Sequence, residues 1–404
     1  NGLEKRPKLR FPGFDEPWEE NELSHYLVEN TERNRGLAFG KEDVLSVSGE
    51  YGVINQIAFQ GRSFAGESVA DYHVVETDDI VYTKSPLKAN PYGIIKVNKG
   101  IPGIVSTLYA VYHPLNTIAP RFVDLYFAND LRLNKFLKPL VNIGAKHDMK
   151  VNNSFVLTGI VVFPSIGEQQ KLVGFFAKLD RRIEAQRKIV EALKKYKRGV
   201  MQRIFRNMSI LSPSGFETVQ LSAIFKKVSR RNSNGEIKNV ITNSAEYGLI
   251  PQRDFFDKDI AVDGNTSNYY VIEHGDFVYN PRKSNTAPYG PFNRYEREER
   301  GIISPLYTCL VLQADIEPSY RAWYFKSDAW YRYIYDNGSQ GVRHDRVSMT
   351  DDLLMGIPVI IPSKEAQLKI ANLLDCLESR FQTELSQYES LKSIRVALLQ
   401  QLFI

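Results

Sequence analysis

The sequence predicts a mixed α/β (α+β) protein in which two similar domains alternate with two long helices. Three observations predict this fold class: a length of 404 residues, an internal repeat close to half that length, and two segments of about 40 residues with apolar residues at heptad spacing. Apolar residues make up 43% of the chain and charged residues 25%, as in ordinary globular proteins. A chain of this length is expected to fold as two or three domains.

The first half of the chain recurs in the second half at an offset of 196 to 198 residues. Residues 48–56, SGEYGVINQ, return as residues 244–252, SAEYGLIPQ. Other matched pairs are Asp79-Ile-Val-Tyr82 with Asp276-Phe-Val-Tyr279, Pro91-Tyr92-Gly93 with Pro288-Tyr289-Gly290, Tyr126-Phe127 with Tyr324-Phe325, and His147-Asp148 with His344-Asp345. A repeat this long indicates a duplicated domain, because the repeats of solenoid proteins run about 20–50 residues.

We expect four segments along the chain: a first domain over 1–163, a first helix over 164–207, a second domain over 208–361 and a second helix over 362–404. Each domain contains short strand-like runs separated by Gly, Pro and Asn turns. One shorter helix is expected in each domain, around 120–137 and 318–335. The topology inside the domains stays open at this point.

The two long-helix segments align without a gap, and eleven of 43 positions are identical between 164–206 and 362–404. The expected seam of the first helix consists of Leu172, Phe176, Leu179, Ile183, Gln186, Val190, Leu193, Lys197, Val200 and Ile204. That of the second consists of Ile370, Leu374, Leu377, Phe381, Glu384, Tyr388, Leu391, Arg395, Leu398 and Leu402. Heptads sustained over this length are typical of a coiled coil. The alternative is a pair of long helices in the core of a globular domain.

Two polar residues interrupt each seam at the same steps. If the helices run antiparallel, one register places Glu384 opposite Lys197 and Gln186 opposite Arg395, which would fix the pairing. Ser165 and Glu168 form the pattern of a capping box at the start of the first helix. The second copy has Ser363 but an alanine in place of the glutamate.

The sequence offers no catalytic constellation, so we expect a protein that is not itself an enzyme and that binds no metal or cofactor. Its six histidines lack metal-ligand spacing, and no glycine-rich loop for S-adenosylmethionine follows a strand. Two cysteines, Cys309 and Cys376, cannot build a disulfide scaffold, and no apolar run is long enough for a membrane helix. These features favour a cytoplasmic protein.

Basic and amide side chains gather in loops at matching places of both halves. Arg, Lys, Asn and Gln are the residues that reach phosphates and base edges in DNA. The candidate DNA-binding residues are Lys84, Lys88, Asn90, Lys146, His147, Arg282, Lys283, Asn285, Gln340, Arg343, His344 and Arg346. The alternative for each cluster is a solvated loop, and for the two His-Asp pairs a structural role. The net charge of +5 permits nucleic acid as a partner without requiring it.

The chain resembles the specificity subunit of type I restriction–modification systems. The resemblance extends over essentially the whole chain and rests on the order domain, long helix, domain, long helix. The motifs that carry it are Leu9-Arg-Phe-Pro-Gly-Phe14, Trp18-Glu19, Pro164-Ser-(x2)-Glu-Gln-Gln-Lys171 and Pro362-Ser-(x3)-Gln-Leu-Lys369. No single motif is very specific, but the architecture is. The alanine that replaces the glutamate of the second capping box is a local departure.

The resemblance implies two target-recognition domains joined by an antiparallel coiled coil. Each domain would recognise one half of a bipartite, asymmetric site in double-stranded DNA, with the coil spanning the unread spacer. Partners would be two methyltransferase subunits, which use S-adenosylmethionine, and restriction subunits, which use ATP and Mg²⁺.

Four apolar positions outside the expected seam suit a face for such partners: Phe175, Ile189, Leu373 and Ile394. Their alternative is packing against the domains. Two rival functions for the chain remain: a protein-binding scaffold that never contacts DNA, and a divergent methyltransferase with its own cofactor site.

Overall fold

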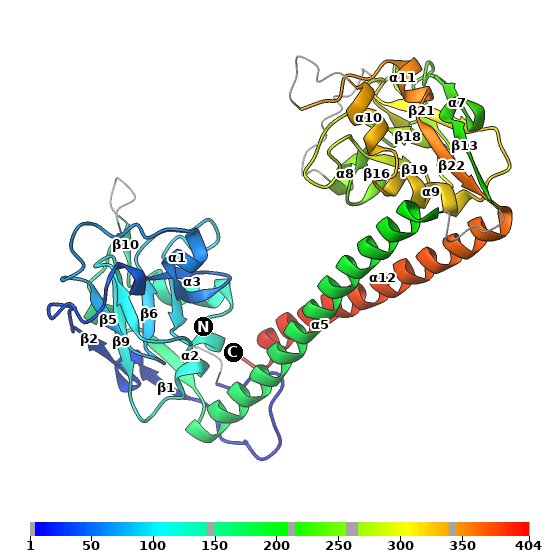
Figure 1. Ribbon diagram of the computed structural model, residues 1–404. Helices are drawn as coiled ribbons and strands as arrows, with labels where there is room; N and C mark the ends of the chain where they lie inside the picture. Colours follow the sequence, from blue (N-terminus) through cyan, green and yellow to red (C-terminus); the bar gives the residue numbers. More distant parts are fainter. Residues whose placement is uncertain (1–4, 144–148, 209–214, 256–265, 339–344, 404) are drawn as a thin grey trace. The chain divides into compact units, whose positions relative to one another are not determined.

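The computed structural model describes residues 5–143, 149–208, 215–255, 266–338 and 345–403 (Figure 1). The chain forms two compact units, one from Asn1–Arg187 with Gln387–Ile404 and one from Lys188–Ser386. Both long helices pass from one unit into the other, so each unit is described by itself. The four segments expected from the sequence keep each long helix whole, whereas these units divide both long helices. The four-segment division stays a prediction.

A four-stranded antiparallel sheet lies at the centre of domain 1, the globular part of the first unit. Its strands, in spatial order, are β2 (Leu27–Asn30), β9 (Tyr109–Pro114), β6 (Ile80–Thr83) and β7 (Ile94–Val97). The paired outer strands are β1 (Glu19–Glu22) with β12 (Ile160–Phe163), β3 (Leu45–Ser48) with β4 (Gly52–Asn55), β5 (His73–Val75) with β8 (Gly103–Val105), and β10 (Asn142–Ile143) with β11 (Met149–Lys150). The short helices are η1 (Leu23–His25), η2 (Lys41–Asp43), α1 (Gln56–Gln60), α2 (Pro120–Tyr126), α3 (Asp130–Leu137) and α4 (Asn153–Val156).

Domain 2, the globular part of the second unit, repeats this topology. Its central strands, in the same order, are β14 (Phe225–Val228), β21 (Thr308–Leu312), β18 (Phe277–Tyr279) and β19 (Phe292–Arg294). The outer pairs are β13 (Phe216–Gln220) with β22 (Pro358–Pro362), β15 (Ile241–Ser244) with β16 (Gly248–Pro251), and β17 (Tyr270–Ile272) with β20 (Gly301–Ile303). The short helices are α7 (Leu221–Ile224), α8 (Gln252–Phe255), α9 (Pro318–Lys326), α10 (Tyr331–Asn337) and α11 (Asp351–Met355). The duplicated mixed α/β fold predicted from the sequence is therefore confirmed.

The matched sequence motifs fix matched local geometry. The Tyr82 hydroxyl donates to the Tyr92 carbonyl at 2.7 Å, and Tyr279 donates to Tyr289 at 2.8 Å. Gly93 has φ of +87°, and a Cβ there would lie 2.0 Å from the Thr83 carbonyl oxygen, so only glycine fits. Its copy at 290 meets the same restriction. The repeat thus preserves the two ends of the loop that joins β6 to β7 and β18 to β19.

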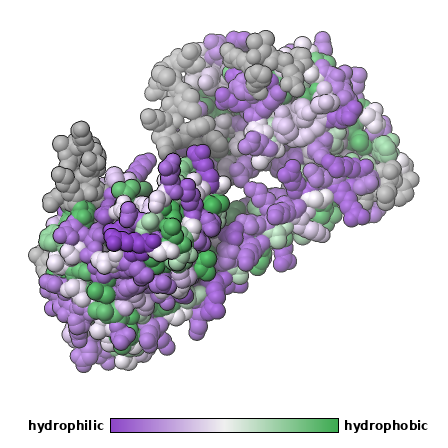
Figure 2. Space-filling view, turned by 60° about the vertical axis from the view of Figure 1, so that its left-hand side comes forward, coloured by the Kyte–Doolittle hydropathy of each residue, from purple (hydrophilic) through white to green (hydrophobic). Residues whose placement is uncertain are grey.

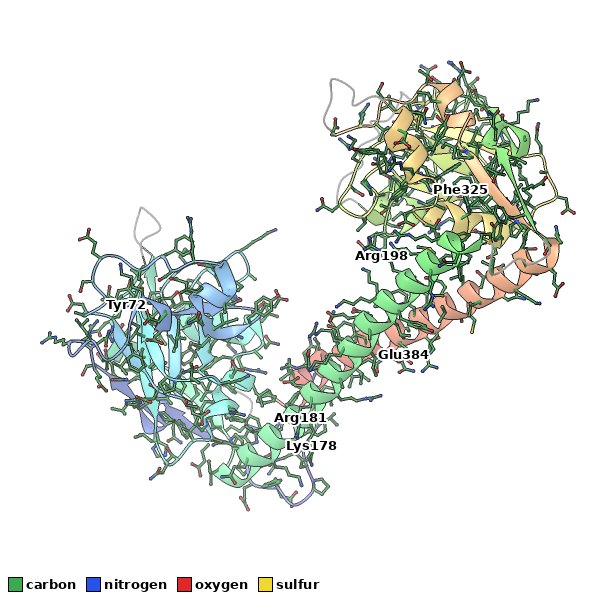
Figure 3. All side chains as sticks on the ribbon, viewed as in Figure 1. Tyr72, Lys178, Arg181, Arg198, Phe325 and Glu384 are labelled. Atoms are coloured by element: carbon green, nitrogen blue, oxygen red, sulfur yellow. The ribbon has the colours of Figure 1, made fainter. Side chains whose placement is uncertain are left out.

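The long helices are α5 (Ile166–Arg206) and α12 (Lys364–Gln401), and they begin at equivalent positions of the repeat. Every residue of the two expected seams is buried or half-buried, which confirms the heptad assignment. Positions away from the seams are mostly exposed, such as Lys178 and Arg181 on α5 (Figure 3).

The helices run antiparallel within each unit. In the first unit, Asp180 of α5 accepts from Arg395 of α12 at 2.5 Å, and Phe176 packs 6.0 Å from Phe403. In the second unit, Lys197 pairs with Glu378. The two ion pairs are copies of each other, since 180 and 378, like 197 and 395, differ by the repeat offset. The expected register was wrong, because Lys197 pairs with Glu378 rather than Glu384, and Arg395 with Asp180 rather than Gln186.

A buried glutamine anchors each long helix to the domain that precedes it. The Gln169 amide donates to the Pro164 carbonyl at 2.9 Å, and its oxygen accepts from the Ala119 N–H at 2.9 Å. Gln367 makes the same pair of bonds, to Pro362 and from Glu317, at the same distances. The expected capping box is not formed, because Glu168 instead binds the guanidinium of Arg10 at 2.8 and 2.9 Å.

The core of each domain is completed by the far end of a long helix. In the first unit, Phe403 stacks on Phe122 with a centroid distance of 5.6 Å and lies edge-on to Trp18 at 6.2 Å. In the second unit, Phe205 near the end of α5 packs against Tyr320 and Tyr324 at 5.8 and 5.5 Å. Removing either helix end would therefore open a hydrophobic core.

We predict that Phe403→Ala lowers the free energy of unfolding of the first unit by about 3–5 kcal/mol, because it leaves a cavity among buried aromatic rings. Ile394→Ala on the same helix is the matched control, since Ile394 is 49% exposed, and it should change stability by less than about 0.5 kcal/mol. Denaturant titration, with amide hydrogen exchange in domain 1 as the probe of unfolding, measures both effects. Equal effects of the two substitutions would contradict the structure.

The ion pairs between the helices provide a second prediction. Glu378→Lys sets two ammonium groups against each other and should cost about 1–2 kcal/mol, and adding Lys197→Glu should recover most of that loss. A thermodynamic double-mutant cycle measures the coupling. Additive effects of the two substitutions would show that the pair does not set the register.

Candidate nucleic-acid interface

Several loops leave each domain at one end of its strands. In domain 1, Thr83 at the end of β6 lies opposite Tyr109 at the start of β9, and Asn30 at the end of β2 lies opposite Val111. The segments after β6, before β9 and after β2 therefore emerge together. A parallel bridge between Val44 and Ile104 shows that β3 and β8 run in the same direction, so the turn after β3 lies at this end as well.

We call this region the loop end of domain 1: residues 31–35, 49–51, 84–90 and 106–108. In domain 2, Tyr279 lies opposite Thr308, Val228 lies opposite Cys309, and Val240 bridges Ile302 in the same way. The loop end of domain 2 consists of residues 229–233, 245–247, 280–287 and 304–306. Most of the described candidate DNA-binding residues lie on these two regions.

The loop end of domain 2 brings three predicted cations together. Arg282 and Arg346 form an antiparallel bridge, and the Lys283 N–H donates to the Asp345 carbonyl at 2.9 Å. The Asp345 carboxylate lies 3.8 Å from Arg282 and 4.0 Å from Arg346. Exposed ion pairs at such distances cost little to break, so the cations can exchange Asp345 for a phosphate or a base.

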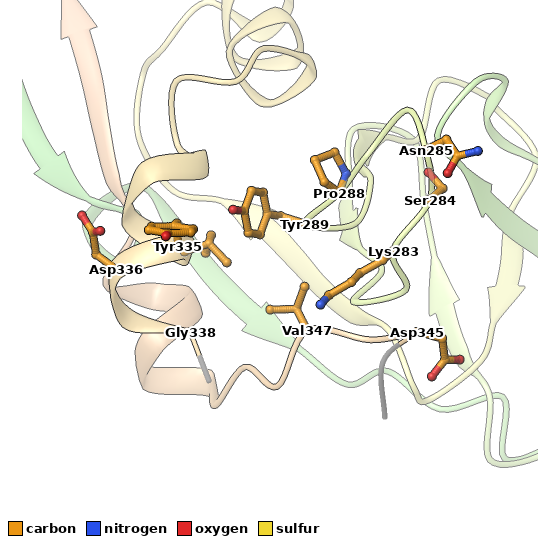
Figure 4. A pocket seen from close by; sticks show the side chains of 11 residues that line it. Lys283, Ser284, Asn285, Pro288, Tyr289, Tyr335, Asp336, Gly338, Asp345 and Val347 are labelled. Atoms are coloured by element: carbon orange, nitrogen blue, oxygen red, sulfur yellow. The ribbon is translucent and has the colours of Figure 1, made fainter. Parts of the chain in front are cut away.

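A cavity of about 860 Å³ lies beside these cations (Figure 4). Its lining includes Lys283, Asn285, Tyr289, Tyr335 and Asp345. Tyr289 and Tyr335 come from the loop after β18 and from α10, and Lys283 lies across the cavity from Tyr335. The lining combines a cation, an amide and aromatic rings, which suits nucleotide recognition.

The loop end of domain 1 has different chemistry. The Lys84 ammonium donates to Asn153 at 3.2 Å, and the Asn153 amide donates to Glu29 at 2.9 Å. Burial lowers the pKa of Lys84. Lys88 is exposed, whereas Asn90 is buried and donates to Asp130 at 2.9 Å. Asn90 therefore supports the loop from inside, and we leave it out of the proposed contacts.

Five candidates, Lys146, His147, Gln340, Arg343 and His344, lie outside the described residues. Two arginines at the loop ends were missed by the sequence reasoning. Arg33 donates to the Asp71 carbonyl at 2.8 Å, and its copy Arg231 donates to Asn268 at 3.2 Å. The signal that could have found them is the repeated Arg-Asn pair at 33–34 and 231–232.

Three of the four expected partner-binding residues are exposed on the helices. Ile189 and Leu373 lie in the second unit at 40% and 49% exposed, and Ile394 lies in the first unit. Phe175 instead packs against Phe11 with a centroid distance of 5.5 Å. Phe175 thus follows the alternative interpretation, in which these positions pack against the chain's own residues.

The surface of both units is largely hydrophilic on the face seen in Figure 2, with separate small hydrophobic patches. Among the described residues, no group of His, Cys, Asp and Glu side chains is arranged to hold a metal ion. Within that same part of the chain, no helix has the length and apolar character required to cross a bilayer.

Solved structures of type I restriction–modification proteins match this chain over nearly its whole length. The S subunit from M. genitalium aligns over 98% of this chain and 99% of its own, with a TM-score of 0.52 and 15% identity. A chain from a solved structure on the assembly and conformational transition of the type I R-M system aligns over 97% and 98%, with a TM-score of 0.53 and 14% identity. No protein-family model matches the sequence, and no curated protein matches it. The chain therefore has the fold of a type I S subunit.

A buried histidine near the loop end of domain 1 makes stability depend on pH. Burial lowers the pKa of His73 to about 4 from an ordinary 6.5, and Arg33 and Lys84 add to the effect. Between these values the unfolded chain takes up a proton that the folded chain does not. The free energy of unfolding should therefore fall as the pH drops from 6.5 to about 4.

The test replaces His73 with the residue found at the equivalent place of domain 2, Tyr270. His73→Tyr should reduce the loss of stability over this pH range by up to about 1.4 kcal/mol per pH unit. Urea denaturation at a series of pH values measures both slopes. Identical slopes for the wild-type protein and the variant would contradict the neutral, buried state of His73.

Proposed function

We propose that this chain is the non-catalytic DNA-specificity subunit of a type I restriction–modification complex and acts in the cytoplasm. Each domain recognises one half of a bipartite, asymmetric site in double-stranded DNA through its loop end. One observation carries this proposal: the same strand framework presents two polar loop ends with different side chains, in a chain with the S-subunit fold over nearly its whole length.

The proposed contacts follow from charge and position. Lys84 and Lys88 serve the first half-site, and Arg282, Lys283, Asn285 and Arg346 the second. Arg33 and Arg231 join them as cations placed alike in both domains. Arg and Lys favour guanine and phosphate, and Asn favours adenine. Lys146, His147, Gln340, Arg343 and His344 stay candidates from the sequence.

Catalysis belongs to partner subunits in this proposal. Two methyltransferase subunits would bind S-adenosylmethionine, and restriction subunits would use ATP with Mg²⁺. In this proposal such partners contact the exposed apolar residues Ile189, Leu373 and Ile394 on the long helices.

The proposal is tested by co-expressing the chain with a methyltransferase subunit of its own system and mapping N6-methyladenine across the host genome. We expect one split motif, methylated on both strands, only when this chain is present. Stable assembly without any new methylation would support the rival function, a protein-binding scaffold. Titration with S-adenosylmethionine alone tests whether the chain has its own cofactor site.

The half-site assignment gives a further prediction. Arg282→Ala should weaken DNA binding by about 1–3 kcal/mol and relax base choice in one half-site only. Arg300→Ala is the control, because Arg300 precedes β20 at the opposite end of the strands and pairs with Glu273 at 2.9 Å. Competition binding with duplexes altered in either half-site measures the effect. Equal losses at both half-sites would contradict the assignment.

A further inference from the structure

Each loop end carries an exposed leucine at the tip of a tight turn. Leu108 between β8 and β9 is 65% exposed, and Leu306 between β20 and β21 is 59% exposed. The turns are held alike: the leucine N–H groups donate to Ser106 and Ser304 hydroxyls at 3.4 and 3.3 Å. Backbone bonds from Tyr109 to Ser106 and from Tyr307 to Ser304 close both turns at 3.1 and 3.0 Å.

A loop with basic residues lies beside each leucine. The Lys84 N–H donates to the Leu108 carbonyl at 3.3 Å, so the basic loop after β6 lies directly beside this turn. In domain 2, Tyr279 at the end of β18 pairs with Thr308 at the start of β21, so the loop that carries Arg282 leaves the sheet beside the turn of Leu306. Each leucine thus lies beside a loop that carries basic residues.

The leucines are the same in both domains, whereas the residues proposed to recognise individual bases differ. The loops beside them differ between the domains, with lysines after β6 and with Arg282, Lys283 and Asn285 after β18. The leucine does not differ, nor do the serine and tyrosine of its turn; the turn changes only from Thr107 to Pro305. A feature kept in both domains, while its neighbours change, serves a contact that both half-sites share.

DNA matches this combination of an apolar tip and a basic surrounding. Its grooves present deoxyribose carbons and thymine methyl groups between rows of phosphates, and apolar side chains contact both. Leu87 is also exposed in the loop end of domain 1, but its counterpart in domain 2 is Ser284, so it is not repeated. The exposed Tyr51 and Tyr247 each follow a glutamate, and Glu246 pairs with Lys194 of α5 at 3.3 Å. Those acidic tips suit DNA less well.

We propose that Leu108 and Leu306 make an apolar contact in a groove of the DNA, one in each half-site, against deoxyribose or thymine methyl carbons. This inference rests on the proposed function. The flanking cations bind phosphate and bring each turn to the groove, and the leucine then removes apolar DNA surface from water.

The test uses the chain assembled with its methyltransferase subunits and a fluorescein-labelled duplex that carries both half-sites. Leu108→Ala and Leu306→Ala should each weaken binding by about fivefold to twentyfold, in line with the loss of one base or sugar contact. The slope of log Kd against log salt should not change, because no phosphate contact is lost. Leu108→Met, which keeps an apolar side chain of similar size, should restore most of the affinity.

Ile101→Ala is the matched control. Ile101 is 76% exposed in the turn before β8, at the opposite end of that strand from Leu108, and its replacement should leave Kd unchanged. Duplexes with uracil in place of thymine identify the apolar group. A loss for the wild-type chain that Leu108→Ala does not share indicates the thymine methyl, and equal binding of both duplexes indicates deoxyribose.

Unchanged affinity of both leucine variants overturns the proposal. So does release of the methyltransferase subunits with intact DNA binding in the remaining complexes, since the turns would then contact protein. Failure of the proposed function has a different signature: the wild-type complex itself would not prefer the cognate duplex over a scrambled one.

Discussion

The structure depends on an exchange of helix ends between the two halves of the chain. α12 follows domain 2 but ends in the core of the first unit, where Phe403 meets Trp18 and Phe122. α5 follows domain 1 but ends in the core of the second unit, where Phe205 meets Tyr320. At their beginnings, Gln169 and Gln367 tie the same helices to the domains that precede them. Each long helix is thus held at both ends by buried contacts, and neither domain is complete without both halves of the chain.

The order of domains and long helices could be predicted because it leaves regular patterns in the sequence. The repeat fixed the equivalence of the two domains, and 3–4 spacing identified the buried face of each helix. It did not predict the register, since Lys197 had acidic candidates at 378 and 384 and only the paired helices select one. Asn90 was predicted at the DNA because an amide is equally common in a buried turn and at a base. Its hydrogen bond to Asp130 joins residues 40 positions apart, so no local pattern could indicate it.

The two domains share a frame but differ in how their loop ends are charged. In domain 1, Lys84 is engaged by Asn153, which also binds Glu29. In domain 2 the equivalent of Glu29 is Lys227, which pairs with Asp351 at 2.5 Å, and Arg282 after β18 lies 3.8 Å from Asp345. Domain 1 has a network through the Asn153 amide where domain 2 has the ion pair of Lys227 with Asp351, so the cations of the two loop ends have different intramolecular partners. Gly93 and Gly290 keep the backbone of the equivalent loops alike. The side chains of the two loop ends therefore differ while the order of the strands stays the same.

The exchange of helix ends also sets an order for folding during synthesis. Residues 204–208, which close the core of the second unit, are made before domain 2, so that unit can pack as soon as its own strands and the start of α12 leave the ribosome. Domain 1 is made first but lacks Leu399, Leu402 and Phe403 until α12 has been made. At about 5–20 residues per second, it waits roughly 10–50 s with part of its aromatic core uncovered. Of the two domains, the one translated first is thus the last to complete its core.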